Sequence, residues 1–323
     1  MQDCTRAWTE LIRVMPQPAK GLLQRLDAGQ SGGVREVRIR CGQAVEIVSE
    51  SGREWLHQAA GQKTPAVADM DFCKRVFSGI SEHSLYAVEA QLKWGYITLP
   101  GGVRVGVAGH AARQDGGGYM ITAAGSFCFR IGRALQGCAD HLMPFVLRGE
   151  SMYSTLLIGP PGCGKTTQLR DVARQLSQRG VHVALVDERG EISGSRSGGS
   201  AFDLGPCCDV MEGIPKAQGM MMMVRSMAPE VMITDEIGHE ADAQAILEAG
   251  NAGVKIIASA HAEDVRSLKM RPALGACLRQ GVFERLAVLS LRDGPGTLES
   301  VMDMGRGAAL VAAKPMLKTG GGV

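Results

Sequence analysis

The fold is decided by the stretch Thr155-Leu156-Leu157-Ile158-Gly159-Pro160-Pro161-Gly162-Cys163-Gly164-Lys165-Thr166-Thr167. Its second part fulfils the pattern G-x-x-x-x-G-K-[ST], and the β-branched and leucine residues before it are typical of a buried strand. After it, Leu169, Val172, Ala173 and Leu176 recur at helical spacing and predict one buried helix face. A strand, a glycine-rich turn and a helix in this order predict a phosphate-binding loop.

The chemistry of this loop predicts a site for a nucleoside triphosphate. Its glycines allow a tight turn whose N–H groups point at phosphate oxygens, and the helix N-terminus adds a partial positive charge. We expect Lys165 to bridge the β- and γ-phosphates and the Thr166 hydroxyl to hold Mg²⁺. The alternative is a purely structural glycine turn, which the flanking strand and helix argue against. The residues assigned to the nucleotide are Gly159, Pro160, Pro161, Gly162, Cys163, Gly164, Lys165, Thr166 and Thr167.

The composition is that of a globular protein with no marked charge. The 323 residues are enough for two domains, and 45% apolar with 21% charged residues is ordinary for a chain that buries a core. A formal net charge of +2 gives no field that would single out nucleic acid or a membrane surface. The nine cysteines include no C-x-x-C pair, and we find neither a secretory signal nor a membrane-spanning stretch. We therefore expect a cytoplasmic protein that reaches any membrane through a partner protein.

Two parts of the chain differ in their patterns. The first contains short runs, with a hairpin expected at 96–107, and predicts a small α/β domain with an antiparallel sheet. The second alternates helical segments with short buried runs, which predicts a parallel sheet covered on both faces. The buried runs lie at 181–186, 231–234, 256–259 and 286–291. The expected boundaries are 1–140 for the small α/β domain, 141–313 for the phosphate-loop domain and 314–323 for a disordered tail.

An acidic pair, Asp235-Glu236, follows the buried run at 231–234. In this fold class an acidic residue at the carboxyl end of a buried strand lies beside the phosphate loop. We expect Asp235 to hold Mg²⁺ through water and Glu236 to orient or deprotonate the attacking water. Two carboxylates divided in this way favour hydrolysis over transfer to a second substrate. The alternative is a solvated pair that ends a strand.

Four more residues are candidates for the same site. His261 closes the next strand and could position water or contact the γ-phosphate, although a lone histidine is more often structural. Asp187 and Glu188 end another strand, where they either join the Mg²⁺ shell or form a salt bridge with Arg189. Arg225 lies on the helix before the Asp-Glu strand, after four methionines that we expect to pack in the core.

The segment Met223-Val224-Arg225-Ser226-Met227-Ala228-Pro229-Glu230-Val231-Met232-Ile233-Thr234-Asp235-Glu236-Ile237-Gly238 resembles a block of the type II and type IV secretion ATPases. The resemblance continues through 241–249 and Gly253 to Ser259-Ala260-His261-Ala262. Together with the phosphate loop and 186–192, these motifs are most similar to the stage III AA sporulation family of endospore-forming bacteria. The similarity covers residues 95 to 310 and is strongest from 155 to 270.

This resemblance implies a RecA-like ATPase core that uses ATP and Mg²⁺ and acts as a hexameric homo-oligomer. It implies a functional His261, and it puts Asp187 and Glu188 at an acidic box. It also implies arginines that reach the nucleotide from the N-terminal domain, for which the candidates are Arg104, Arg130 and Arg133. In the sporulation family it implies service to a channel between mother cell and forespore, with docking on a membrane protein. Secretion ATPases usually carry Gly-Glu where this chain has Asp235-Glu236, which favours specialisation away from pilus work.

We therefore predict an ATP-hydrolysing motor, and two alternatives stay open. One is a nucleic-acid translocase or recombinase on the same core, which the near-neutral charge and the 4% aromatic content argue against. The other is an ATP-gated assembly scaffold with little turnover. A nucleoside or shikimate-type kinase is less favoured, because no arginine-bearing lid follows the phosphate loop.

Overall fold

The computed structural model describes residues 2–26, 33–49, 51–57, 64–81, 85–93, 95–113, 119–131, 135–194, 202–262, 264, 267–268 and 270–312. The chain divides into two compact units, the first made of Met1–Ala134 with Arg189–Phe202 and the second of Leu135–Glu188 with Asp203–Val323. Arg133 and the expected tail at 314–323 lie outside the described residues.

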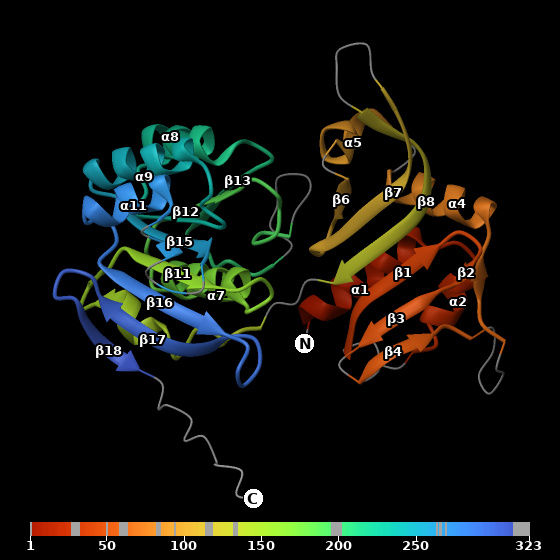
Figure 1. Ribbon diagram of the computed structural model, residues 1–323, viewed down its shortest axis with the longest axis horizontal. Helices are drawn as coiled ribbons and strands as arrows, with labels where there is room; N and C mark the ends of the chain where they lie inside the picture. The colour runs from red at the N-terminus through yellow and green to blue at the C-terminus, as the bar shows by residue number, and fades with distance from the viewer. Residues whose placement is uncertain are drawn as a thin grey trace, which may run out of the picture. The chain divides into compact units, whose positions relative to one another are not determined.

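The first unit is built on a six-stranded antiparallel sheet in the order β4-β3-β1-β8-β7-β6 (Figure 1). Its strands are β1 (Val34–Arg40), β3 (Glu46–Ser49), β4 (Gly52–Trp55), β6 (Tyr96–Leu99), β7 (Val103–Arg113) and β8 (Tyr119–Ile131), beside a separate pair of β2 (Gln43–Ala44) and β5 (Val67–Ala68). Its helices are α1 (Gln2–Val14), α2 (Ala19–Leu23), α4 (Met70–Ile80) and α5 (Leu85–Leu92). The hairpin expected at 96–107 is confirmed, with Val103, Val105 and Val107 buried on one face.

The second unit is built on an eight-stranded sheet in the order β13-β12-β14-β15-β11-β16-β17-β18. The first six of these strands run parallel, β17 pairs antiparallel with β16, and β18 pairs antiparallel with β17. The strands are β11 (Thr155–Gly159), β12 (Val183–Asp187), β13 (Cys208–Glu212), β14 (Val231–Thr234), β15 (Lys255–His261), β16 (Arg285–Ser290), β17 (Thr297–Asp303) and β18 (Ala308–Ala312). The helices are α6 (Met143–Val146), α7 (Lys165–Gln178), α8 (Lys216–Met227), α9 (Glu240–Asn251) and α11 (Pro272–Arg279), with a short strand pair of β9 (Leu147–Arg148) and β10 (Ser151–Met152).

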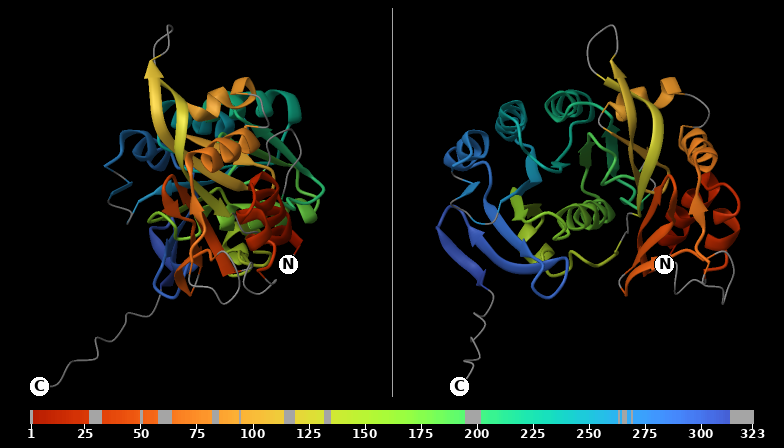
Figure 2. Two further views of the ribbon diagram at one scale, coloured as in Figure 1. Left: turned by 90° about the vertical axis from the view of Figure 1, so that its right-hand side faces the viewer. Right: turned by 45° about the vertical axis from the view of Figure 1, so that its right-hand side comes forward.

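Helices cover both faces of this sheet, α7 on one side and α8, α9 and α11 on the other (Figures 1 and 2). Alternate strand residues such as Leu156, Ile158 and Val186 pack with the second set of helices in one apolar cluster. Strands that are buried on both faces account for the continuous apolar runs in the sequence. The expected α/β fold, with a mostly parallel sheet behind the phosphate loop, is confirmed.

Residues Arg189–Phe202, which follow β12 in the chain, belong to the first unit, and we call this segment the excursion. There the Gly102 N–H donates to the Gly194 carbonyl at 3.0 Å, and Arg104 forms an ion pair with Glu191. The Phe202 ring lies so close to Gly102 that a Cβ on this glycine would be 2.4 Å from a ring carbon. The two contiguous domains that we expect from the sequence do not include this excursion.

Within the described ranges, no helix combines the length and the apolar character that a membrane span requires.

Candidate functional site

The phosphate loop joins the end of β11 to the start of α7, and two of its glycines are there for steric reasons. Gly159 has a φ of 156°, and a Cβ on it would lie 2.4 Å from the Leu289 carbonyl oxygen. Gly164 has a φ of 93° as the N-cap of α7, and a Cβ there would lie 3.0 Å from the Gly296 nitrogen. Larger residues would be strained at both positions. The backbone can therefore turn tightly enough to form a cradle for phosphate groups.

Lys165 is buried at the end of this cradle, with 6% of its surface exposed. Its Nζ donates hydrogen bonds to the carbonyl oxygens of Gly159 (2.8 Å) and Pro160 (2.9 Å), and it lies 3.1 Å from His261 Nδ1. Burial lowers the pKa of Lys165, and Cys163 and Glu236 partly oppose that shift. The ammonium is thus held inside the loop, where bound phosphates would lie.

The register of the parallel strands brings the predicted acidic and histidine residues to the same edge. Gly159 of β11 is paired with His261 of β15, and Thr234 of β14 is paired with Ala258 of β15. Since Asp235 and Glu236 directly follow Thr234, they lie at the carboxyl edge with the phosphate loop. Asp187 ends β12 on the far side of β14, where it is fully buried.

His261 links the lysine to the predicted catalytic carboxylate. An ammonium can only donate, so Nδ1 of His261 accepts from Lys165 and its Nε2 carries the proton. That Nε2 faces Glu236 Oε1 at 3.6 Å. Both side chains are a little over one-third exposed, so water can reach them. The arrangement can hold a water molecule between a carboxylate and the phosphate loop.

A buried lysine that the sequence analysis missed also lies at this edge. Lys216, the first residue of α8, is 4% exposed, and its Nζ lies 3.0 Å from Glu188 Oε2. Burial by itself would lower the pKa of Lys216. The nearby carboxylates of Asp235, Glu188 and Asp242 have the opposite effect and outweigh burial, so the pKa of Lys216 is raised above its usual value. Lys216 lies in none of the motifs described above, and it is 28 residues from Glu188 along the chain.

The remaining predicted residues lie in different surroundings. Thr166 and Thr167 are half-buried in the first turn of α7. Arg225 is exposed in the last turn of α8, close to the point where the chain enters the amino end of β14. The structure therefore does not bring Arg225 to the carboxyl edge of its own sheet. In the first unit, Arg104 stacks on Tyr96 at 4.0 Å and pairs with Glu191, while Arg130 lies 3.6 Å from Glu36.

These residues fit magnesium only as a partner of phosphate. Within the described part of the chain, no group of three or more His, Cys, Asp or Glu side chains could hold a metal ion by itself. Magnesium in nucleotide sites takes one or two protein oxygens and fills its shell with water and phosphate oxygens. The Thr166 hydroxyl and the buried Asp235 carboxylate have the chemistry for that small share.

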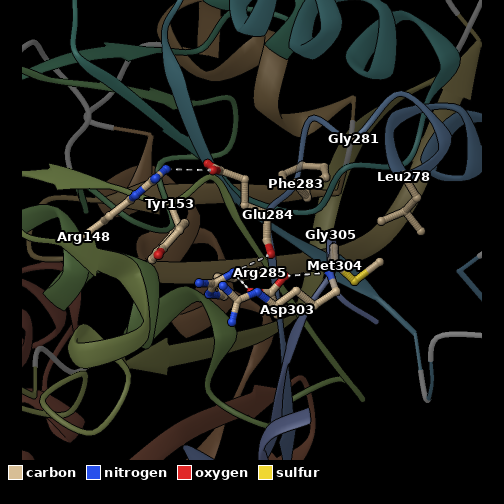
Figure 3. Close-up of a pocket in the computed structure, with 11 residues that line it drawn as sticks. Arg148, Tyr153, Leu278, Gly281, Phe283, Glu284, Arg285, Asp303, Met304 and Gly305 are labelled. Carbon is tan, nitrogen blue, oxygen red and sulfur yellow. Dashed lines mark hydrogen bonds and ion pairs between the residues drawn. The ribbon is translucent and has the colours of Figure 1, made fainter. Parts of the chain in front are cut away.

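A separate cavity of about 350 Å³ lies at the opposite edge of the sheet, where β11 and β16 begin (Figure 3). Its charged residues pair with neighbouring groups. Arg285 Nη1 lies 2.9 Å from Asp303 Oδ2 and its guanidinium stacks on Tyr153, while Glu284 Oε2 lies 2.8 Å from Lys255 Nζ. None of the predicted site residues lines this cavity.

Comparison with known proteins relates the chain to sporulation and secretion proteins. A family model described as "Sporulation stage III, protein AA" matches residues 8–310. Stage III sporulation protein AA of Bacillus subtilis (strain 168) is 39% identical over 300 residues, which cover 91% of this chain and 94% of that protein.

Two solved structures show the fold. The Legionella pneumophila ATPase DotB matches with a TM-score of 0.53 and 16% identity, over 85% of this chain and 76% of its own. The pilus retraction motor PilT with bound ADP matches with a TM-score of 0.53 and 13% identity, over 79% and 74% of the two chains. The RecA-like fold of secretion ATPases, expected from the sequence, is thereby confirmed.

Proposed function

Because the chain belongs to the sporulation stage III protein AA family, we propose that it is an ATPase of the secretion-motor type that hydrolyses ATP at its phosphate loop. The fold that it shares with the ATPase DotB and the pilus retraction motor PilT supports the proposal. ATP and Mg²⁺ are the proposed ligands.

One observation carries this proposal, the contact series from Lys165 through His261 to Glu236. Lys165 Nζ lies 3.1 Å from His261 Nδ1, and His261 Nε2 lies 3.6 Å from Glu236 Oε1. A structural glycine turn would need none of these three side chains at the edge of the sheet. A phosphate-transfer site needs a cation at the phosphates and a carboxylate beside them.

Each side chain receives a role that follows from its chemistry. Lys165 binds the phosphates and stabilises negative charge that develops on them during transfer. Glu236 orients the attacking water and accepts its proton, and His261 fixes the orientation of Glu236 relative to Lys165. Thr166 would hold magnesium through its hydroxyl and Asp235 would hold it through water, and the ion would supply positive charge next to the phosphates. Asp187 and Glu188 belong to the surrounding acidic shell.

The biological setting that we propose comes from the family. The chain would act as a homo-oligomer, of hexameric form by analogy with secretion ATPases, and would power or assemble a channel complex between mother cell and forespore. It would dock there on a membrane protein. Arg104 and Arg130 are proposed, with Arg225, as charged groups that complete a nucleotide site in the assembled ring.

The test compares ATP turnover and ATP binding in the wild type and in Lys165→Ala and Glu236→Gln. We expect Lys165→Ala to weaken both, and Glu236→Gln to bind ATP while turnover falls about 10²- to 10⁴-fold. Glu230→Gln, which alters a carboxylate at the other end of β14, serves as the matched control. If Glu236→Gln hydrolyses ATP as fast as the wild type, Glu236 is not the base. ATP binding without turnover in the wild type would favour the scaffold, and turnover stimulated by DNA would favour the translocase.

A further inference from the structure

Lys216 occupies a place that local chemistry disfavours. Lysine is rarely buried unless it is paired, and its long side chain ordinarily brings the ammonium to water. Here only 4% of the residue is exposed. Lys216 is also the first residue of the 12-residue helix α8, where the helix dipole opposes a positive charge. The groups around the ammonium must therefore stabilise it.

Those groups are carboxylates from three different elements. Glu188, just after β12, accepts a hydrogen bond from Lys216 Nζ at 3.0 Å. Asp235, just after β14, and Asp242, in the first turn of α9, lie close enough to interact electrostatically with the same ammonium. Asp235 and Asp242 are themselves 3% and 5% exposed. Buried like charges repel strongly, and one central cation offsets that repulsion.

The same carboxylates hold the segments that carry the proposed catalytic groups. Asp242 Oδ2 accepts from the His239 N–H at 3.1 Å and so fixes the turn that follows Glu236. Asp235 directly precedes Glu236 in the chain. Glu188 is the last residue of the second unit before the chain leaves for the first. A displacement of any of the three carboxylates would shift the edge that faces the nucleotide.

We propose that Lys216 is a positioning residue of the ATP site, whose ammonium holds the Glu188, Asp235 and Asp242 carboxylates together at the carboxyl edge of the sheet. This rests on the proposed function of that edge. Lys216 supplies a permanent positive charge beside the carboxylates, whether or not a nucleotide is bound. A magnesium ion that arrives with ATP then meets an edge that is already in place, so little rearrangement is needed.

The opposite edge of the same sheet offers a second lysine–carboxylate pair as a control, in which the lysine is more exposed. Lys255 Nζ lies 2.8 Å from Glu284 Oε2, and Lys255 is at the first residue of β15, away from the phosphate loop. If Lys216 acts only by holding the fold together, Lys216→Met and Lys255→Met will show the same response of the melting temperature to MgCl₂ and the same ATP turnover in the folded protein. If Lys216 positions the ATP site, the two variants will differ in both measurements.

The first experiment measures melting temperature against MgCl₂ concentration without nucleotide. We expect MgCl₂ to raise the melting temperature of Lys216→Met more than that of the wild type, because carboxylates that have lost their ammonium attract hydrated divalent ions, which weaken the repulsion between them without being coordinated by the protein alone. Lys255→Met should follow the wild type. An equal response of all three proteins would overturn the proposal. This measurement needs no turnover, so it stands even if the protein proves not to be an ATPase.

The second experiment measures turnover and nucleotide affinity. We expect Lys216→Met to lower turnover by about 10- to 100-fold with ATP affinity changed by less than about threefold, and Lys216→Arg to recover most of it. In the double variant Lys216→Met/Glu188→Gln, both charges of that pair are removed. A loss of turnover in this variant therefore cannot be attributed to misfolding around an unpaired Glu188 carboxylate. The double variant should lose about as much turnover as Lys216→Met alone, because the pair acts as a unit. Full turnover in a folded Lys216→Met would contradict the proposal.

Discussion

Glu236 has an unusual backbone conformation for its residue type. Its φ of 41° lies in the left-handed region, which costs a residue other than glycine of order 1–3 kcal/mol. Ala228 has a similar φ of 46°, but it ends α8, where such a conformation is common. Glu236 ends no helix, and its N–H instead donates to the Ser259 hydroxyl at 3.0 Å. The neighbouring strand thus holds the carboxylate in a strained position, as is frequent at functional sites.

Asp171 on α7 provides a residue-scale prediction about pH. It is 3% exposed and accepts hydrogen bonds from the Ala139 N–H (2.9 Å), Arg174 Nε (2.8 Å) and Gln175 Nε2 (3.0 Å). Burial alone would raise the pKa of Asp171, but these hydrogen bonds outweigh it and lower the pKa. We expect Asp171→Asn to reduce the free energy of unfolding by about 1–3 kcal/mol at neutral pH.

The sign of the pH effect follows from the lowered pKa. A carboxylate of this kind stabilises the fold above its unfolded pKa, near 3.8, and this stability is lost as the pH falls through the folded pKa. The difference between wild type and Asp171→Asn should therefore shrink in urea titrations below about pH 4. Asp209→Asn, on the exposed side of edge strand β13, should stay within about 0.5 kcal/mol of the wild type. A difference that grows at low pH would contradict this assignment.

At the scale of elements, Gly219 sets how closely α8 approaches the sheet. A Cβ at this position would lie 2.7 Å from Val186 Cγ1 and 3.0 Å from Ile214 Cγ2. Alanine favours a helix over glycine by about 1 kcal/mol, but here the overlap should dominate. We expect Gly219→Ala to lower the free energy of unfolding by about 1–3 kcal/mol, measured by urea denaturation.

Gly250 on α9 is the control for that prediction. A Cβ there would lie 3.5 Å from Val282 Cγ1, which is ordinary van der Waals contact. Gly250→Ala should therefore stabilise the protein by about 0.5–1 kcal/mol through helix propensity and unfolded-state entropy. Equal effects of the two substitutions would show that the approach of α8 to β12 does not depend on the missing side chain.

Elements with a strong local signal were predictable from the sequence. The phosphate loop, β14 and β15 follow from glycine spacing and short apolar runs, and the acidic and histidine residues follow from the ends of those strands. Strand β13 was missed because it is a half-exposed edge strand with an acidic residue at its second and last positions. Lys216 was missed because its importance arises only where β12, β14 and α9 converge, which no local pattern records.

At the scale of the whole molecule, the chain passes from the second unit to the first and back again. Residues Arg189–Phe202 belong to the first unit although they lie between two strands of the second unit. Their sequence, rich in glycine and serine, resembles a surface loop, yet Ile192 is fully buried and Phe202 is 3% exposed. The burial of these two apolar residues could not be predicted from the sequence, because they are widely spaced among glycine and serine residues that are typical of a loop.

This path predicts how the second unit behaves alone. A shortened protein of residues 135–312 keeps the excursion but lacks β6 and β7, against which it packs, so Ile192 and Phe202 would face water. We expect that protein to bind a hydrophobic dye and to self-associate in light scattering. Replacement of residues 189–202 by a glycine-serine linker of the same length should abolish both effects, because it removes the exposed apolar side chains and leaves all eight strands of the sheet. If the two shortened proteins behave alike, the excursion is not anchored by its apolar residues, and Phe202→Ser in the full chain should then leave its stability unchanged.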